Sequence, residues 1–135
     1  MRILKFMPCL VLLLLSACGS AEVKNVQSQA DLFMERLSRG DHNGAFELCD
    51  ADAVSLDALR NIANNPAYDP VLNDYQGLSY QEGAQATRNE QDEIYELRLP
   101  PARFKGHDGW VAHFAFRKEG GKWQIIGFKI EGPSQ

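Results

Sequence analysis

The stretch that decides the fold covers residues 110–130 and reads WVAHFAFRKEGGKWQIIGFKI. Two runs rich in aromatic and β-branched residues flank Gly120-Gly121, and this combination predicts a β-hairpin with a two-residue turn. Counting outward from the turn places Phe116 opposite Ile125 on the partner strand. The C-terminal part of the chain is therefore expected to form a long antiparallel strand pair.

An unbroken register across this hairpin makes both of its faces apolar. It sets Ala115 opposite Ile126 and His113 opposite Phe128. One face then carries Trp110, Phe114, Phe116, Trp123 and Ile125, and the other carries Val111, Ala115, Ile126, Phe128 and Ile130. Because an antiparallel sheet usually has one polar face, we expect helices on one side and a pocket floor or a partner subunit on the other. A bulge near Gly127 would instead turn over the last residues of the hairpin.

Helical periodicity precedes the strands. Apolar residues recur with helical spacing at Val23, Val26, Ala30, Phe33 and Leu37, which predicts a helix over residues 22–39 that ends at Gly40. Asp41 is expected to cap a second short helix with Ala45, Phe46 and Cys49 on one side. Ser55 is expected to cap a third, with Leu56, Leu59 and Ile62 facing inward.

The segment between the helices and the hairpin has weaker signals. Residues 68–83 contain Pro70 and Gly77 among large side chains, so we expect a packed loop with a short strand near residues 78–80. A strand over 84–88, a turn over 89–92 and a half-buried strand over 93–99 follow. Helices first and an antiparallel meander afterwards predict an α+β fold.

Two segments resemble the nuclear transport factor 2-like superfamily of cystatin-like α+β cones. One is FMERLSRGD, residues 33–41, followed by Ala45; the other is KEGGKWQI, residues 118–125, followed by Gly127-Phe128. The likeness is greatest to small lipoproteins of unknown function within it. The resemblance implies N-terminal helices packed on a curved antiparallel sheet that leaves a conical cavity. Some members of that superfamily are enzymes, others bind ligands, and others dimerise through the sheet, so it does not fix a function.

The N-terminus has the features of a secretory leader. Arg2 and Lys5 precede an apolar run that is about ten residues long, too short to cross a bilayer as a mature helix. The tetrapeptide LSAC, residues 15–18, resembles the lipobox of bacterial lipoproteins. By that resemblance residues 1–17 are removed and Cys18 is acylated. Gly19, rather than Asp, favours the outer membrane over the inner one in enterobacterial-type sorting.

The rest of the chain is expected to be a single domain. Residues 18–21 form the lipidated cysteine and a short tether, and residues 22–135 form one α+β domain. Removing residues 1–17 removes two basic side chains and leaves 12 basic against 18 acidic residues, a formal charge of -6. Such a charge disfavours nucleic acid and anionic headgroups as partners. We therefore expect membrane contact through the lipid alone.

Few side chains suggest chemistry. His113 is the one weak catalytic candidate, because a strand histidine near a carboxylate can move protons. Tyrosines suit half-wet ligand sites, and the weak ligand-binding candidates are Tyr68, Tyr75, Tyr80 and Tyr95. Cys49 is expected to be a buried core thiol. With no metal-ligand spacing, phosphate loop or nucleophile elbow, we expect no metal site and no cofactor.

These observations leave three functions open. The first is a non-enzymatic, lipid-anchored envelope protein, facing the periplasm, that binds a small apolar ligand or a partner protein in or on the curved sheet. The second is a structural assembly factor that works as a homodimer through the sheet. The third is a small-molecule isomerase, dehydratase or hydrolase. The absence of a recognisable catalytic constellation favours the first.

Overall fold

The structure, a computed structural model, describes residues 21–81, 87–89 and 95–134. Its class is α+β, as predicted, with helices first and an antiparallel sheet afterwards. A helix over residues 21–38, here called the N-terminal helix, precedes α2 (His42–Phe46), α3 (Leu56–Ala63), the 3-10 helix η1 (Pro66–Tyr68) and α4 (Asp69–Leu72). The strands are β1 (Leu78–Ser79), β2 (Thr87–Asn89), β3 (Tyr95–Arg98), β4 (Ala102–Phe104), β5 (Val111–Glu119) and β6 (Lys122–Glu131).

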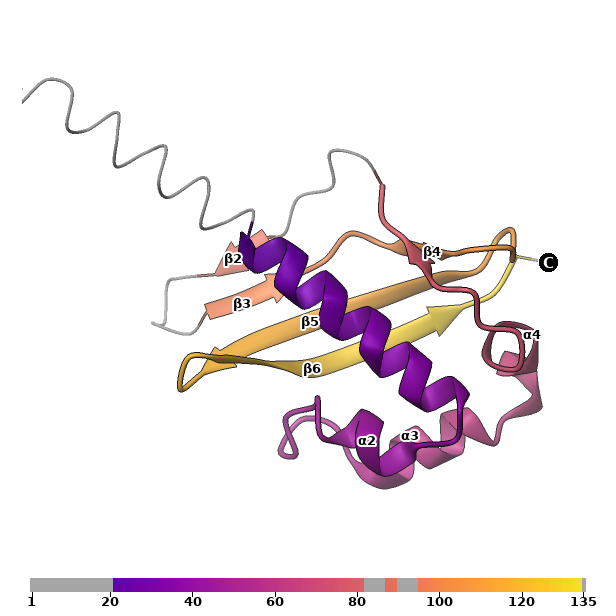
Figure 1. Cartoon of the computed structure of the whole chain (residues 1–135), viewed down its shortest axis with the longest axis horizontal. Helices are drawn as coiled ribbons and strands as arrows, with labels where there is room; N and C mark the ends of the chain where they lie inside the picture. The colour runs from indigo at the N-terminus through magenta and orange to yellow at the C-terminus, as the bar shows by residue number, and fades with distance from the viewer. Residues whose placement is uncertain (1–20, 82–86, 90–94, 135) are drawn as a thin grey trace, which may run out of the picture.

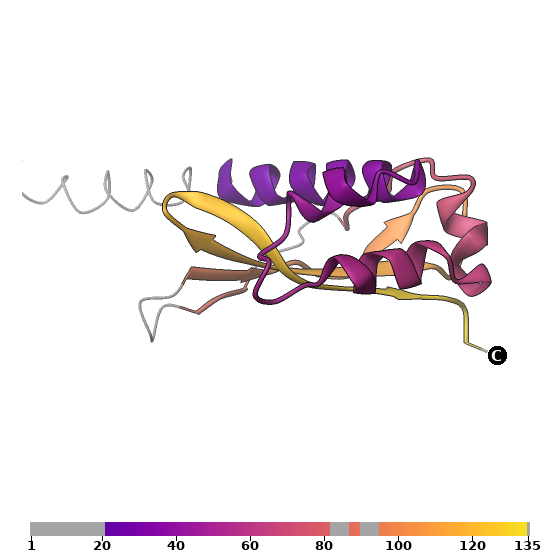
Figure 2. The ribbon, with the colours of Figure 1, turned by 90° about the horizontal axis from the view of Figure 1, so that it is seen from below.

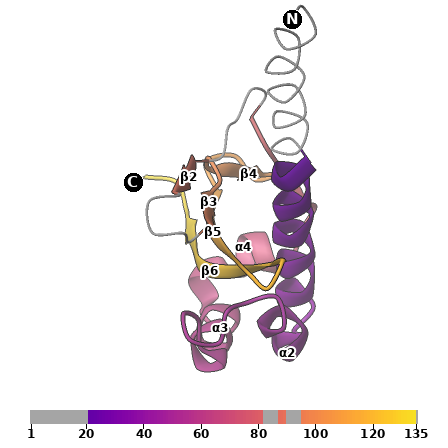
Figure 3. The ribbon, with the colours of Figure 1, turned by 90° about the vertical axis from the view of Figure 1, so that its left-hand side faces the viewer.

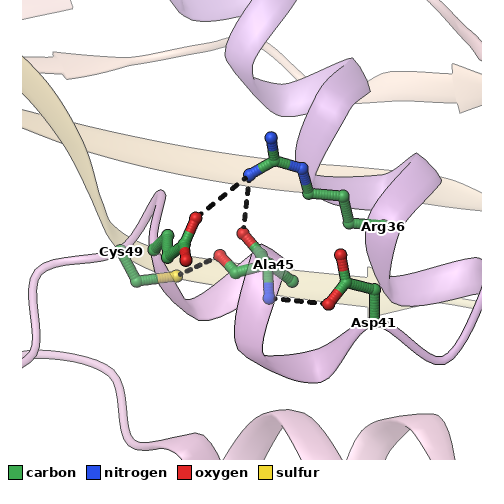
Figure 4. A network of polar contacts seen from close by, with 6 residues as sticks. Arg36, Asp41, Ala45 and Cys49 are labelled. Carbon is green, nitrogen blue, oxygen red and sulfur yellow. Dashed lines mark hydrogen bonds and ion pairs between the residues drawn. The ribbon is translucent and has the colours of Figure 1, made fainter.

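The turn between the N-terminal helix and α2 is held by a compact set of polar contacts (Figure 4). Gly40 ends the helix with a φ of 80°, and Asp41 caps α2 by accepting a hydrogen bond from the Gly44 backbone N–H at 2.9 Å. Arg36 donates to the Gly44 carbonyl oxygen at 2.9 Å. A Cβ at Gly44 would clash with the Asp41 carboxylate, so a larger residue would displace this cap. The predicted end of the N-terminal helix near Gly40 and both predicted caps, Asp41 and Ser55, are confirmed.

The segment after α2 joins the sheet edge. Ile125 of β6 donates its backbone N–H to Leu48 and accepts one from Asp50, at 2.9 and 2.8 Å, and Cys49 forms a parallel bridge with Ile125. The expectation that Cys49 lies on the helix is therefore wrong, because α2 ends at Phe46. Its burial is confirmed: Cys49 is 4% exposed, and burial raises the pKa of its thiol to about 12.

Strand β5 is the centre of the sheet. Within the described residues all strand pairs are antiparallel, with β6 on one edge of β5 and both β3 and β4 on the other (Figure 1). Arg98 pairs with Ala115, and Ala102 pairs with Ala112. The link from β3 to β4 is therefore one residue longer than the stretch of β5 that it follows, and the two prolines at 100 and 101 lie in this link. Strand β4 was not predicted, because these prolines indicate the end of a strand.

A β-bulge changes the faces of the hairpin. The predicted pair Phe116–Ile125 is confirmed, and Lys118 pairs with Trp123, but the register then shifts by one residue. Ala115 pairs with Gly127 rather than Ile126, and His113 pairs with Lys129 rather than Phe128. The bulge therefore brings Phe128 and Ile130 to the face that carries Phe114 and Phe116. The expectation of two apolar faces is therefore wrong, and the alternative named from the sequence, a bulge near Gly127 that turns over the last residues of the hairpin, is confirmed.

The sheet therefore has one apolar, inner face and one polar, outer face. The N-terminal helix crosses the inner face, whereas α2 and α3 lie beyond the β6 edge (Figures 1 and 2). Seen from the end, the outer face carries none of the described helices (Figure 3). Phe33 fills the space between helix and sheet, with its ring centroid 5.8 Å from that of Phe114 and 4.8 Å from that of Phe128. Aromatic side chains thus occupy the place where the resemblance implied a conical cavity.

Candidate functional site

A pocket lies between the second half of the N-terminal helix and the segment after α4. Its volume is about 610 Å³, and its walls are Asp31, Glu35, Ser38 and Arg39 from the helix and Leu72, Asn73, Tyr75, Gln76 and Gly77 from the segment. The helix turns its apolar residues to the sheet, so its polar residues remain on the side that borders this segment. Gly77, with a φ of 107°, lets the chain turn from the pocket wall into β1.

Asp31 is the most unusual group in this pocket. Its Oδ1 atom is buried and has no hydrogen-bond partner among the described residues. Burial raises the pKa of the Asp31 carboxyl, while a hydrogen bond from the Leu78 backbone, the charge of Lys105 and the Tyr80 hydroxyl lower it by less. The ionised carboxylate is thus held where it is partly desolvated.

Tyr75, another residue of the pocket wall, also has an unpartnered polar atom. Its hydroxyl oxygen is buried without a hydrogen-bond partner among the residues that the structure describes. Burial, followed by the negative charges of Asp31 and Glu35, raises the pKa of the Tyr75 phenol. The ring packs edge-on against Phe104 with centroids 6.3 Å apart, which fixes the position of the hydroxyl.

Tyr80 lies close by, but its hydroxyl is used by the fold. It donates a hydrogen bond to the Gln27 backbone oxygen at 3.0 Å. Burial, and then the charge of Asp31, raises the pKa of this phenol as well. Tyr80, which directly follows β1, is therefore linked to the N-terminal helix. Its hydroxyl has a hydrogen-bond partner, so Tyr80 is the natural comparison for Tyr75, whose hydroxyl has none among the described residues.

At the rim the charges are balanced. Glu35 and Arg39, one helical turn apart, form an ion pair, and both side chains are largely exposed. The pocket thus has a polar rim, and beneath the surface of its wall lie a carboxylate oxygen that can accept a hydrogen bond and a phenol that can donate one.

The structure brings together only part of the set named from the sequence. Tyr75 lines the pocket and Tyr80 adjoins Asp31, whereas Tyr68 packs against the core elsewhere and Tyr95 on β3 is 40% exposed. His113 is on the outer face of β5, where its Nε2 atom is 3.1 Å from Glu131 Oε2. The weak catalytic candidate does meet a carboxylate, but on an open sheet face and away from the pocket.

Asp31 was missed by the sequence reasoning. In the helical pattern it is simply a polar residue beside the apolar positions Ala30 and Phe33, and such residues are usually solvated. Its burial depends on the 72–77 segment, which has no periodic pattern. The spacing of Asp31 and Glu35, four residues apart on one side of the helix, was the signal that could have pointed to it.

Comparison of the chain with protein-family models, with curated proteins and with solved structures found no match. Among the described residues, no helix combines the length and the apolar character that crossing a membrane requires. The same part of the chain contains no cluster of three or more His, Cys, Asp or Glu side chains arranged to hold a metal ion. Cys18 lies outside the described residues.

Proposed function

We propose that this protein is a lipid-anchored protein of the bacterial envelope that binds a small ligand, without transforming it, in the pocket between Asp31 and Tyr75. The observation that carries the binding function is that two residues of one pocket wall, Asp31 and Tyr75, each have a buried polar atom without a hydrogen-bond partner among the described residues. Buried polar groups in native proteins nearly always have partners, because an unpaired one costs about 1–3 kcal/mol. A ligand that pairs with both would recover that cost.

The proposed ligand has apolar and polar parts. Leu72 and the Tyr75 ring give the pocket apolar surface, and Asp31 Oδ1 and Tyr75 Oη supply one acceptor and one donor. This differs from the purely apolar ligand expected from the sequence, since the interior between helix and sheet is filled by Phe33 and its neighbours. A small molecule with a hydroxyl or amide group fits this arrangement best.

An experiment can test binding directly. Purified protein would be titrated with small hydroxyl- and amide-bearing aromatic compounds while backbone NMR shifts are followed. We expect shifts around residues 31 and 72–77, and affinities about tenfold weaker in Asp31→Asn and in Tyr75→Phe. Tyr80→Phe is the matched control and should bind within about twofold of wild type. Equal affinity in all four proteins would refute the assignment of the pocket.

An isomerase or dehydratase remains the second candidate, and one observation favours it. A carboxyl group with a raised pKa beside two phenols is an arrangement that can move a proton and stabilise the negative charge that results. The two functions differ in what Asp31→Asn does. If the protein is an enzyme, the variant still binds substrate but stops its conversion; if it only binds, bound compounds are recovered unchanged from wild type.

Lipid anchoring rests on residues 15–18, the lipobox-like LSAC at the end of the apolar run. Two or more acyl chains would hold the protein stably, at about 0.8 kcal/mol per buried methylene. Expression of Cys18→Ala in a bacterial host should leave an uncleaved precursor without acyl chains, as read by mass spectrometry. Cleavage of that variant at the same bond, with the protein in the same membrane fraction, would refute the anchor. The outer membrane, favoured by Gly19, is part of the same proposal.

The superfamily resemblance is retained as part of the proposal. Its support is the turn at Gly40-Asp41 and the terminal hairpin around Trp123, both of which take the local conformations that the resemblance implies. A homodimer through the sheet was expected because of a second apolar face. The sheet has no such face among the described residues, so this reason for a homodimer no longer applies. A partner of the outer face of β5 and β6 would have to be complementary to a polar surface.

A further inference from the structure

The outer face of the sheet contains a hollow where two small residues meet. Ala115 on β5 and Gly127 on β6 are cross-strand partners, and the β-bulge beside them sets this pairing. Their neighbours on the same face are large, so the pair forms the floor of a pocket of about 340 Å³. A Cβ built on Gly127 would meet no atom within 4 Å, which confirms that the space above it is open.

Basic side chains surround this hollow. Arg98 pairs across β3 and β5 with Ala115, and Lys129 pairs across β5 and β6 with His113. Arg98, His113 and Lys129 all line the pocket. The hollow is thus bordered by a guanidinium on one side and by an ammonium and an imidazole on the other.

Of the basic side chains that line the hollow, Arg98 alone has no ion pair with a described residue. Lys129 and His113 share Glu131, and Arg117 contacts both Glu96 and Asp50 at 3.1 and 3.9 Å. Arg98 is exposed and has no ion pair among the described residues. A positive excess at this point contrasts with the formal charge of -4 of the whole chain.

We propose that this hollow is a second binding site, one that takes the phosphate group of a small soluble ligand. A guanidinium can pair with two phosphate oxygens at once, and the ammonium of Lys129, although paired with Glu131, still has N–H groups that can donate to a further phosphate oxygen. The small side chains of Ala115 and Gly127 let the ligand approach the sheet closely. The volume exceeds that of a phosphate alone, so the rest of the ligand is accommodated beside it.

This site is independent of the pocket at Asp31. The two are on opposite sides of the sheet, and the hollow attracts anions whereas the pocket contains an unpaired carboxylate oxygen. Failure of one proposal therefore leaves the other intact. The proposal is compatible with the expectation that nucleic acid and anionic headgroups are disfavoured as partners, because it concerns one local group of basic side chains and a small soluble ligand.

Two substitutions and one matched control test the site. Arg98→Gln removes the unpaired charge, and Gly127→Val fills the hollow at a position with room for a side chain and no left-handed φ. Arg103→Gln is the control, since Arg103 is an exposed arginine of the same sheet, on β4, that does not line the hollow. The probes are inorganic phosphate, glycerol 1-phosphate, acetate and glycerol, titrated into the purified protein while backbone NMR shifts are followed. Vesicles of phosphatidylcholine with and without phosphatidylglycerol form a separate arm.

The expected result is saturable binding of both phosphates, with shifts around residues 98, 113–115 and 127–129. Affinity should fall about tenfold or more in Arg98→Gln and in Gly127→Val, and stay within about twofold in Arg103→Gln. Equal weakening by Arg98→Gln and Arg103→Gln would overturn the site, because it would show general charge attraction. Acetate binding as tightly as phosphate, or binding confined to phosphatidylglycerol vesicles, would overturn the ligand class. Unchanged thermal unfolding of the variants shows that the fold is retained.

Discussion

Single atoms distinguish the two tyrosines beside Asp31. The hydroxyl of Tyr80 donates to a backbone oxygen, whereas that of Tyr75 is buried without a partner among the described residues. Removing a satisfied hydroxyl and removing an unsatisfied one have opposite effects on stability. Comparing the two tyrosines therefore distinguishes a hydroxyl that stabilises the fold from one that is available to a ligand.

We expect Tyr75→Phe to leave the free energy of unfolding unchanged or to raise it by about 1 kcal/mol, because the variant no longer buries an unpaired hydroxyl. Tyr80→Phe should lower it by about 0.5–1.5 kcal/mol, because the bond to Gln27 is lost. Urea denaturation of the three proteins measures both changes. A loss of about 1 kcal/mol or more in Tyr75→Phe would show that its hydroxyl serves the fold.

Asp31 gives a prediction about pH. Its pKa in the folded state is raised above the ordinary value of 3.8, so the folded protein binds the proton more tightly than the unfolded chain does. Its stability contribution then decreases as pH rises from about 3.8 through the raised value, and the ionised carboxylate is unfavourable at neutral pH. Asp31→Asn should therefore be more stable than wild type at pH 7, and the difference should shrink as the pH is lowered through that window.

Chemical denaturation at a series of pH values measures this difference. Glu35→Gln, a rim residue whose partner is Arg39, is the comparison, and its effect should be small because exposed ion pairs contribute little. A stability difference for Asp31→Asn that grows toward low pH would contradict the predicted sign.

At the scale of elements, the hairpin depends on one inserted residue. Ile126 is the extra residue of the β-bulge, and its exclusion from the ladder keeps Phe128 and Ile130 on the core face. Deleting Ile126 should remove the bulge while Gly127, Phe128 and Ile130 keep their present partners Ala115, Phe114 and Ala112, so both side chains stay in the core. We therefore expect the deletion to lower the free energy of unfolding by only about 1 kcal/mol in urea denaturation, since the half-buried Ile126 side chain is lost and the core side chains keep their sites.

Ile126→Ala is the control for this deletion, because it shortens the side chain but keeps the residue count and the bulge. It should cost about 1 kcal/mol, since Ile126 is only half-buried. A deletion that costs more than about 3 kcal/mol beyond this substitution would contradict the assigned bulge, because it would mean that Phe128 and Ile130 had left the core.

This bulge also shows which features of the fold could be predicted from the sequence and which could not. The helix ends, the caps at Asp41 and Ser55 and the turn at Gly120-Gly121 were predictable, since each depends on neighbours within a few residues. The register beyond Phe116 was not, because it depends on which face can be buried against Phe33, far earlier in the chain. The same holds for Asp31, whose burial depends on the distant 72–77 segment.

At the scale of the whole molecule, the arrangement of the elements orients the pocket relative to the proposed anchor. The described helix begins at residue 21, three residues after Cys18, a span of at most about 10 Å when extended. The β5–β6 turn lies at the end where the N-terminal helix begins, and α4 lies at the opposite end (Figures 1 and 2). Anchored at Cys18, the protein would have its hairpin turn near the bilayer and its Asp31 pocket farther out, toward the periplasm.

Single dye labels on the lipidated protein test this orientation. Lys122→Cys marks the turn and Asn73→Cys marks the end of α4; both positions are exposed, while Cys49 is buried with a pKa of about 12 and should react only after unfolding. In vesicles with an acceptor dye on the headgroups, energy transfer should be stronger from the label at 122 than from the label at 73. The helix accounts for the difference, because its residues 21–38 span about 27 Å. Equal transfer from both sites would mean that the short tether does not set the orientation, and reversed transfer would place the pocket against the membrane.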